Sequence, residues 1–139
     1  MTTDEAKLLL LMHSFCHPDI HHPKMETGFL GSLRPYRGLK VENFHEVMTA
    51  LRVLAPLLQE SQVDRDIVGA LWSICDLSYS WGVHPEGMLR RNDLIAHADV
   101  VRLERWGNRI SYASRILLGG VSGDAAIAEA FHGYDSNER

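Results

Sequence analysis

The 139-residue sequence has little of several features that place other proteins in a class. It has two cysteines, Cys16 and Cys75, which are too few for a disulfide framework. Its first apolar run, residues 8–12, is five residues long and follows acidic residues, the reverse of a secretory signal. No later run is long enough to span a membrane. We therefore expect a cytoplasmic, reducing location.

Positive charge is also scarce, and it is unevenly placed. The net charge is −4, and the only lysines are at positions 7, 24 and 40. Residues 84–118 are the exception, with six arginines and four acidic residues. A local excess of this size can orient an acidic partner, but it is far below the charge density of a dedicated nucleic-acid binder. The sequence therefore disfavours nucleic acid as the partner.

No catalytic motif is complete. The segment GGVSGD, residues 119–124, is neither a G-x-S-x-G nucleophile turn nor a phosphate loop, because it lacks lysine and ends in an acid. Cys75 lies in a strongly apolar segment, where burial raises the pKa of a thiol and makes it inert. Asp76 could line a polar recess, but a solvated helix face, or a pair with Arg90 or Arg91, explains it better. The sequence thus favours a non-enzymatic protein and implies no cofactor.

Helical periodicity dominates the chain, and strand signals are sparse. A first helix starts near Thr2, whose spacing to Glu5 is that of a capping box, and stops before Pro18. Further helices are expected over residues 42–61, 64–82, 89–118 and 124–133, with Gly82 as a C-terminal cap and a break near His97. The predicted fold class is all-α: one domain, residues 1–139, forming a bundle of about five helices.

Three segments predict which side chains form the core. Apolar residues recur at intervals of three and four in the clearest seam of the chain: Leu103, Trp106, Ile110, Ala113 and Leu117. Residues 64–82 are apolar over so much of the helix circumference that this helix should lie in the middle of the bundle. In the first helix we expect burial of Leu8, Leu11, Met12 and Phe15. We predict near-complete burial of six side chains, two of them in the seam: Leu51, Leu71, Trp72, Cys75, Trp106 and Ile110. Alternatively, the seam from Leu103 to Leu117 forms the interface of a homodimer.

A long irregular connection follows the first helix. Residues 17–41 show no convincing helix, whereas connections in bundles usually have about two to eight residues. The segment carries apolar groups to bury, namely Phe29, Leu30, Leu33 and Tyr36. We therefore expect an ordered loop packed against the bundle, because apolar burial must offset the entropy of fixing it. Residues 134–139 are expected to be a frayed tail.

The stretch HSFCHPDIHH, residues 13–22, raises the alternative of a metal site. His13 and Cys16 are spaced i, i+3 at the end of a helix, and His17 or His21 could return across the turn. Imidazole and thiolate are zinc ligands, but none of the usual paired-ligand spacings is present. Histidines near the negative end of a helix dipole explain the stretch better. The alternative function is a metal-dependent or small-ligand-binding helical enzyme centred on residues 13–22.

Two segments carry the candidate residues for partner binding: Arg34, Tyr36, Arg37, Arg102, Arg105 and Arg109. Arginine and tyrosine are enriched at binding hot spots. If the two segments are neighbours, they form an aromatic and basic surface on an acidic protein, suited to another protein with an acidic surface. The preferred interpretation is a non-enzymatic, cytoplasmic protein-binding module, such as a regulatory partner or a toxin-neutralising immunity-type protein.

Overall fold

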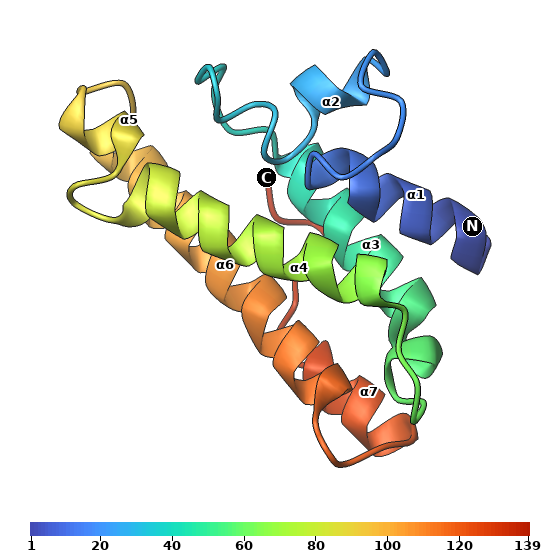
Figure 1. Cartoon of the computed structure of the whole chain (residues 1–139). Helices are drawn as coiled ribbons and strands as arrows, with labels where there is room; N and C mark the ends of the chain where they lie inside the picture. The colour runs from blue at the N-terminus through green and yellow to red at the C-terminus, as the bar shows by residue number, and fades with distance from the viewer.

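The computed structural model describes residues 1–139, and its regular structure is helical (Figure 1). Five helices have seven residues or more: α1 (Thr3–His13), α3 (Val41–Leu58), α4 (Arg65–Ser78), α6 (His97–Leu118) and α7 (Asp124–Ala130). Two single-turn helices, α2 (Lys24–Thr27) and α5 (Met88–Arg91), and a π-helical turn, η1 (Tyr79–Val83), complete the chain. The prediction of an all-α bundle of about five helices with a long connection after the first is confirmed.

Side-chain caps set the N-terminal ends of two helices, α1 and α4. The N–H of Glu5 donates to Thr2 Oγ1 (3.1 Å) and the N–H of Thr2 donates to Glu5 Oε2 (3.0 Å), so the predicted capping box starts α1. The Asp64 carboxylate caps α4 by accepting from the N–H of Asp66 (2.9 Å). The break near His97 is also present, because α5 ends at Arg91 and α6 begins at His97. Side-chain caps depend on residues a few positions apart, which is why the capping box at Thr2 was predictable from the sequence alone.

Gly82 does not cap a helix as we expected. The chain passes from α4 into η1, and Gly82 is buried inside that turn. A Cβ at Gly82 would lie 2.5 Å from Leu103 Cδ2, so the missing side chain lets η1 approach α6 closely.

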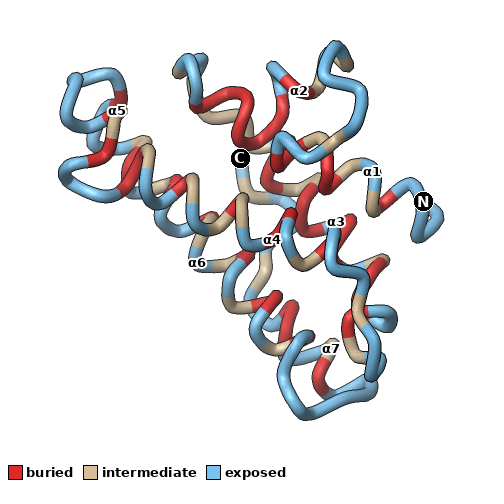
Figure 2. Tube along the Cα trace, in the orientation of Figure 1, coloured by how far each residue is buried: buried red, intermediate tan, exposed pale blue.

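The helices enclose one core. α1 packs on α3 and α4, while α6 packs on α3, α4 and α7, and buried residues line the inner sides of these helices (Figure 2). All five residues of the predicted seam are at most 1% exposed. Leu51, Leu71, Trp106 and Ile110 are also buried as predicted. The seam therefore packs inside the chain and leaves no exposed apolar stripe on α6 for a second copy.

Two helices present a different face from the predicted one. Trp72 is 73% exposed and Cys75 is only half-buried, because α4 has α1 and α6 as neighbours and no helix over its outer side. The buried stripe of α4 consists of Ile67, Ala70, Leu71, Ile74 and Ser78. In α1, Leu8 is 44% exposed and Phe15, just beyond its end, is 38% exposed, while Leu10 and His13 are fully buried. The predicted burial of Trp72, Cys75, Leu8 and Phe15 is wrong.

The segment from residue 17 to 41 packs against the bundle through Met25, Phe29, Leu30 and Leu33, all buried. At the other end of the chain, residues 134–139 differ from the frayed tail that we expected. Tyr134 packs its ring edge-on against Phe44 (5.7 Å between centroids), and Glu138 forms an ion pair with Arg105 of α6. Contacts with distant helices, which the sequence of the tail does not reveal, hold these two residues.

Candidate protein-binding surface

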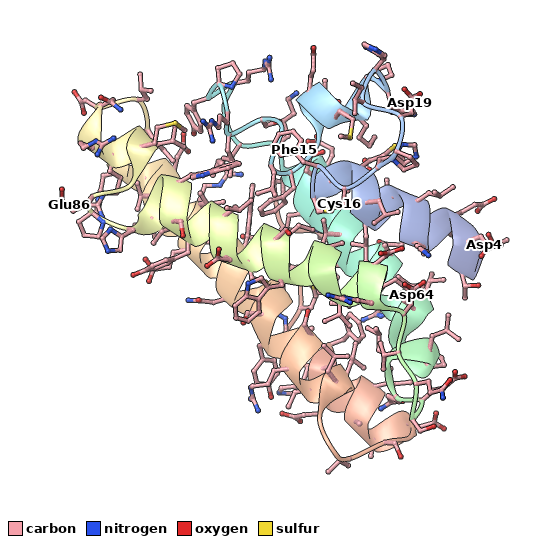
Figure 3. All side chains as sticks on the ribbon, in the orientation of Figure 1. Asp4, Phe15, Cys16, Asp19, Asp64 and Glu86 are labelled. Carbon is pink, nitrogen blue, oxygen red and sulfur yellow. The ribbon has the colours of Figure 1, made fainter.

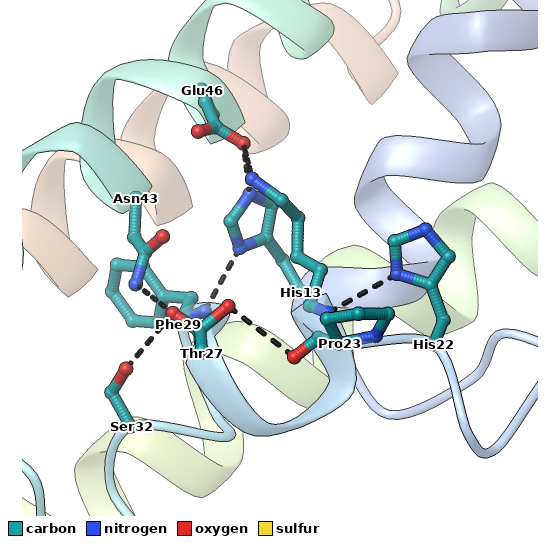
Figure 4. Close-up of polar contacts among 9 residues, drawn as sticks. His13, His22, Pro23, Thr27, Phe29, Ser32, Asn43 and Glu46 are labelled. Carbon is teal, nitrogen blue, oxygen red and sulfur yellow. Dashed lines mark hydrogen bonds and ion pairs between the residues drawn. The ribbon is translucent and has the colours of Figure 1, made fainter.

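A buried histidine anchors the long loop (Figure 4). The backbone N–H of Phe29 donates to His13 Nδ1 (2.8 Å), and the N–H of Leu30 donates to the carbonyl of His13 (3.1 Å). Because Nδ1 accepts a hydrogen bond, the neutral ring carries its proton on Nε2, which donates to Glu46 Oε1 (3.1 Å) on α3. His13 therefore fastens the loop to α1 and to α3 at one point.

Glu46 completes this anchor with a charge. Lys24 of α2 donates to the same oxygen of Glu46 (2.6 Å). The hydrogen bond from His13, together with the bond from Lys24, lowers the pKa of Glu46 to about 2, although its partial burial acts in the opposite direction. The carboxylate is therefore ionised at neutral pH and holds α2 against α3.

The loop then presents Arg34 at the tip of a tight turn. Leu33 and Tyr36 form an isolated β-bridge on either side of a cis Arg34–Pro35 peptide bond, and Leu33 is buried. Arg37 is exposed but turns back, because its Nη1 donates to the carbonyls of Glu26 (3.0 Å) and Gly31 (2.9 Å). Arg34 forms no ion pair. Of the two loop arginines, only Arg34 has a guanidinium that forms no hydrogen bond or ion pair within the chain.

Three side chains meet beside this turn, and we call Phe15, Arg34 and Trp81 the aromatic–basic cluster. The Arg34 guanidinium carbon lies 5.4 Å from the centroid of the Trp81 ring, a cation–π arrangement. The Phe15 and Trp81 ring centroids are 6.3 Å apart. Figure 3 shows Phe15 at the end of α1, whereas Trp81 lies in η1, so the cluster joins three separate segments. Both aromatic rings remain partly accessible to solvent.

The backbone at two of these residues is unusual. Phe15 has φ +64°, the left-handed region that favours glycine, and the N–H of Cys16 donates to the carbonyl of Leu11 (2.8 Å), as in a Schellman motif. For a bulky residue this conformation costs on the order of 1 kcal/mol. Trp81 lies in a π-helical turn, a form that is frequent at functional sites. The packing of Phe15 on Trp81 helps to hold the strained conformation.

The arginines predicted on α6 divide into two groups. Tyr36 Oη donates to Asp99 Oδ2 (2.9 Å), and Asp99 pairs with Arg102 (3.8 Å). Burial and the bond to Asp99 raise the pKa of Tyr36 above its usual range, so its hydroxyl stays a donor. The loop and the first of the α6 arginines are therefore neighbours, as the surface that we predicted required. Arg105 instead pairs with Glu138 near the C-terminus, and Arg109 donates to the carbonyl of Ala130 at the end of α7.

Sequence reasoning missed two members of the cluster. Phe15 and Trp81 were assigned to apolar helix faces, and nothing in their sequence neighbourhood distinguishes them from core residues. Arg34 was identified, because an arginine in a loop between buried apolar residues is expected at the rim. Of the six predicted partner-binding residues, the structure places Arg34 in the cluster and links Tyr36 to Arg102 through Asp99.

The residues suggested for an alternative metal centre do not converge into a set of ligands. Both ring nitrogens of His13 are engaged, and Cys16 and His21 are exposed. His17 Nδ1 accepts from the N–H of Asp19 (3.0 Å). No group of three or more histidine, cysteine, aspartate or glutamate side chains lies close enough to hold a metal ion. The histidine-rich stretch is a helix end and an anchor.

The two candidates for catalysis on α4 are also unsupported. Burial, with a smaller effect from the charge of Asp76, raises the pKa of the Cys75 thiol to about 11. The thiol is therefore protonated at neutral pH and is a weak nucleophile. Asp76 itself is exposed and forms no ion pair with Arg90 or Arg91.

Comparisons of the chain with protein-family models, with curated proteins and with solved structures found no match. None of the helices has both the length and the apolar character needed to cross a bilayer.

Proposed function

We propose that the protein is a non-enzymatic, cytoplasmic protein-binding module that recognises an acidic partner protein through the aromatic–basic cluster. Regulatory partners and toxin-neutralising immunity-type proteins are modules of this kind. The observation that carries the proposal is Arg34, an exposed arginine without a carboxylate partner in its own chain, placed over the Trp81 ring. The two cysteines are unpaired, which supports a reducing compartment.

The geometry of Arg34 suits a carboxylate on another protein. Stacking on Trp81 limits the rotamers of the arginine, so less side-chain entropy is lost when a partner binds. The guanidinium still offers several N–H donors, which can form a bidentate pair with a carboxylate. Phe15 and Trp81 add apolar area beside the charge, and tryptophan and arginine are the residues most often found at hot spots.

The test compares two arginines that stack on aromatic rings. Arg34 lies 5.4 Å from the Trp81 ring, and Arg115, exposed on α6, lies 5.3 Å from the Tyr112 ring. Partners would be captured from the native cell with the wild-type chain, identified by mass spectrometry, and purified for stopped-flow measurement of association. We expect Arg34→Glu to slow association about tenfold at low salt, and less at high salt, while Arg115→Glu has little effect.

A second variant tests the apolar part of the surface. Trp81→Leu removes the platform for Arg34, and we expect faster dissociation of the same partner. Thermal unfolding of each variant checks that the fold is retained. Equal loss of binding in Arg34→Glu and Arg115→Glu, or a partner complex in which Arg34 remains exposed, would contradict the proposal.

A further inference from the structure

A recess lies between α6 and the C-terminal segment, residues 133–138. It has a volume of about 630 Å³ and is open to solvent. α6 contributes Arg105, Asn108, Arg109 and Tyr112 to its lining, and the segment 133–138 forms the opposite wall. None of these residues belongs to the aromatic–basic cluster.

Glu138 and Tyr134 hold the C-terminal wall of this recess against the bundle. The carboxylate of Glu138 accepts hydrogen bonds from Arg105 Nε (3.0 Å) and Nη2. Tyr134 packs edge-on against Phe44, and its hydroxyl lies 2.6 Å from His45 Nδ1. His45 Nε2 lies 2.7 Å from the carbonyl oxygen of Glu138, so His45 donates from Nε2 and accepts at Nδ1. The segment thus contacts the bundle through the Tyr134 ring, through two hydrogen bonds with His45 and through the Glu138 carboxylate on Arg105.

The recess retains unused donors after these contacts. Arg109 Nη2 donates to the carbonyl of Ala130, but its buried Nε has no partner. Burial holds the pKa of Arg109 below its usual value, which means that its positive charge is incompletely compensated. The Asn108 side chain forms no hydrogen bond within the chain. The buried Nε of Arg109 has a free-energy cost in the folded chain, whereas the exposed amide of Asn108 is free to donate to an incoming carboxylate.

We propose that this recess is a peptide-binding site for an acidic segment of a partner protein, and that the carboxylate of Glu138 acts as an internal competitor at Arg105. The carboxylate of Glu138 on Arg105 shows the chemistry that the site accepts, and Tyr134 shows that an aromatic residue fits beside it. Arg105 is 54% exposed, so its ion pair with Glu138 is screened by solvent and adds little to stability. A carboxylate of a partner can therefore replace that of Glu138 on Arg105 while Tyr134 stays packed on the bundle.

The probe is a fluorescent synthetic peptide with the sequence of residues 131–139, FHGYDSNER, titrated into the full chain by fluorescence anisotropy. We expect Glu138→Gln to bind the peptide about threefold more tightly than the wild type, because Arg105 is freed from its internal partner. Adding Arg105→Glu to that variant is expected to abolish the gain. Glu104→Gln, on the exposed side of the same helix, is the control for charge alone and should bind like the wild type.

A peptide in which glutamine replaces the residue corresponding to Glu138 should bind Glu138→Gln several-fold more weakly than the original peptide does. Glu138→Ala repeats the experiment with a different side chain, and thermal unfolding confirms that each variant is folded. Equal affinity of the wild type and both Glu138 variants would overturn the proposal. So would binding that Arg105→Glu leaves unchanged. This experiment uses no residue of the aromatic–basic cluster, so its outcome is independent of the function proposed above.

Discussion

The helices α6 and α4 pack against one another, but their tryptophans have opposite environments. Trp106 of α6 is 1% exposed and stacks on Phe44 (5.3 Å between ring centroids), whereas Trp72 of α4 is 73% exposed. In α6, charged residues separate the apolar positions, so the periodicity indicates which face is buried. In α4, apolar residues occupy most of the circumference, so the pattern predicts a helix but not its inner face. The hydrophobic pattern alone therefore predicts which face of a helix is buried only where polar residues mark the exposed face.

The two tryptophans provide the largest expected difference. We expect Trp106→Ala to lower the free energy of unfolding by about 3–5 kcal/mol, because it leaves a cavity among buried neighbours. Trp72→Ala should change it by less than about 0.5 kcal/mol, since the ring loses little buried area. Urea unfolding followed by circular dichroism measures both. Similar losses in the two variants would mean that α4 is covered in solution.

A glutamate pair extends the comparison to charge. Glu46 of α3 bonds to His13 and Lys24, whereas Glu104 of α6 is exposed and forms no ion pair. We expect Glu46→Gln to lower stability at neutral pH by roughly 1–2 kcal/mol, a value reduced for solvent screening. Glu104→Gln should have almost no effect.

The pH dependence of stability distinguishes the same two residues. The pKa of Glu46 in the folded protein is about 2, below its ordinary value of 4.5. Its contribution is therefore present above pH 4.5 and is lost as the pH falls toward 2. We expect Glu46→Gln to flatten the decline of stability over this interval, as measured by unfolding at a series of pH values. A decline as steep as that of the wild type and of Glu104→Gln would show that the anchor is not formed.

Two glycines, Gly82 in η1 and Gly69 in α4, have opposite surroundings, one closely packed and the other open to solvent. A Cβ at Gly82 would meet Leu103, while a Cβ at Gly69 of α4 has no heavy atom within 4 Å. We expect Gly82→Ala to destabilise the protein by about 1 kcal/mol, because a well-packed side chain must shift. Gly69→Ala should stabilise it by about 0.5–1 kcal/mol, since alanine favours the helix. Melting temperatures that move in the same direction would contradict this assignment.

The smallest difference concerns the two loop arginines that the sequence treated alike. Arg37 donates to two backbone carbonyls, whereas Arg34 contacts the Trp81 ring at the surface. We expect Arg37→Glu to cost about 1 kcal/mol of stability and Arg34→Glu less than about 0.5 kcal/mol. Hydrogen exchange of the amides in residues 28–33 gives a local readout, and only Arg37→Glu should accelerate it.

The sequence by itself determined the all-α fold class, the capping box at Thr2 and Glu5 and the buried seam of α6. Each of these depends on residues within a few positions of one another, so local propensity and periodicity suffice. It also identified Arg34 as an exposed arginine on an ordered loop, which is one member of the candidate site.

Only the tertiary structure decided which faces of α1 and α4 are buried, and which side chains meet in the aromatic–basic cluster. Phe15, Arg34 and Trp81 come from segments far apart in the chain, and their contact depends on the anchor at His13. In the same way, Glu138 meets Arg105 only after α6 and the C-terminal segment are brought together. Contacts between distant segments depend on how all the helices pack at once, and no local pattern of residues encodes that packing.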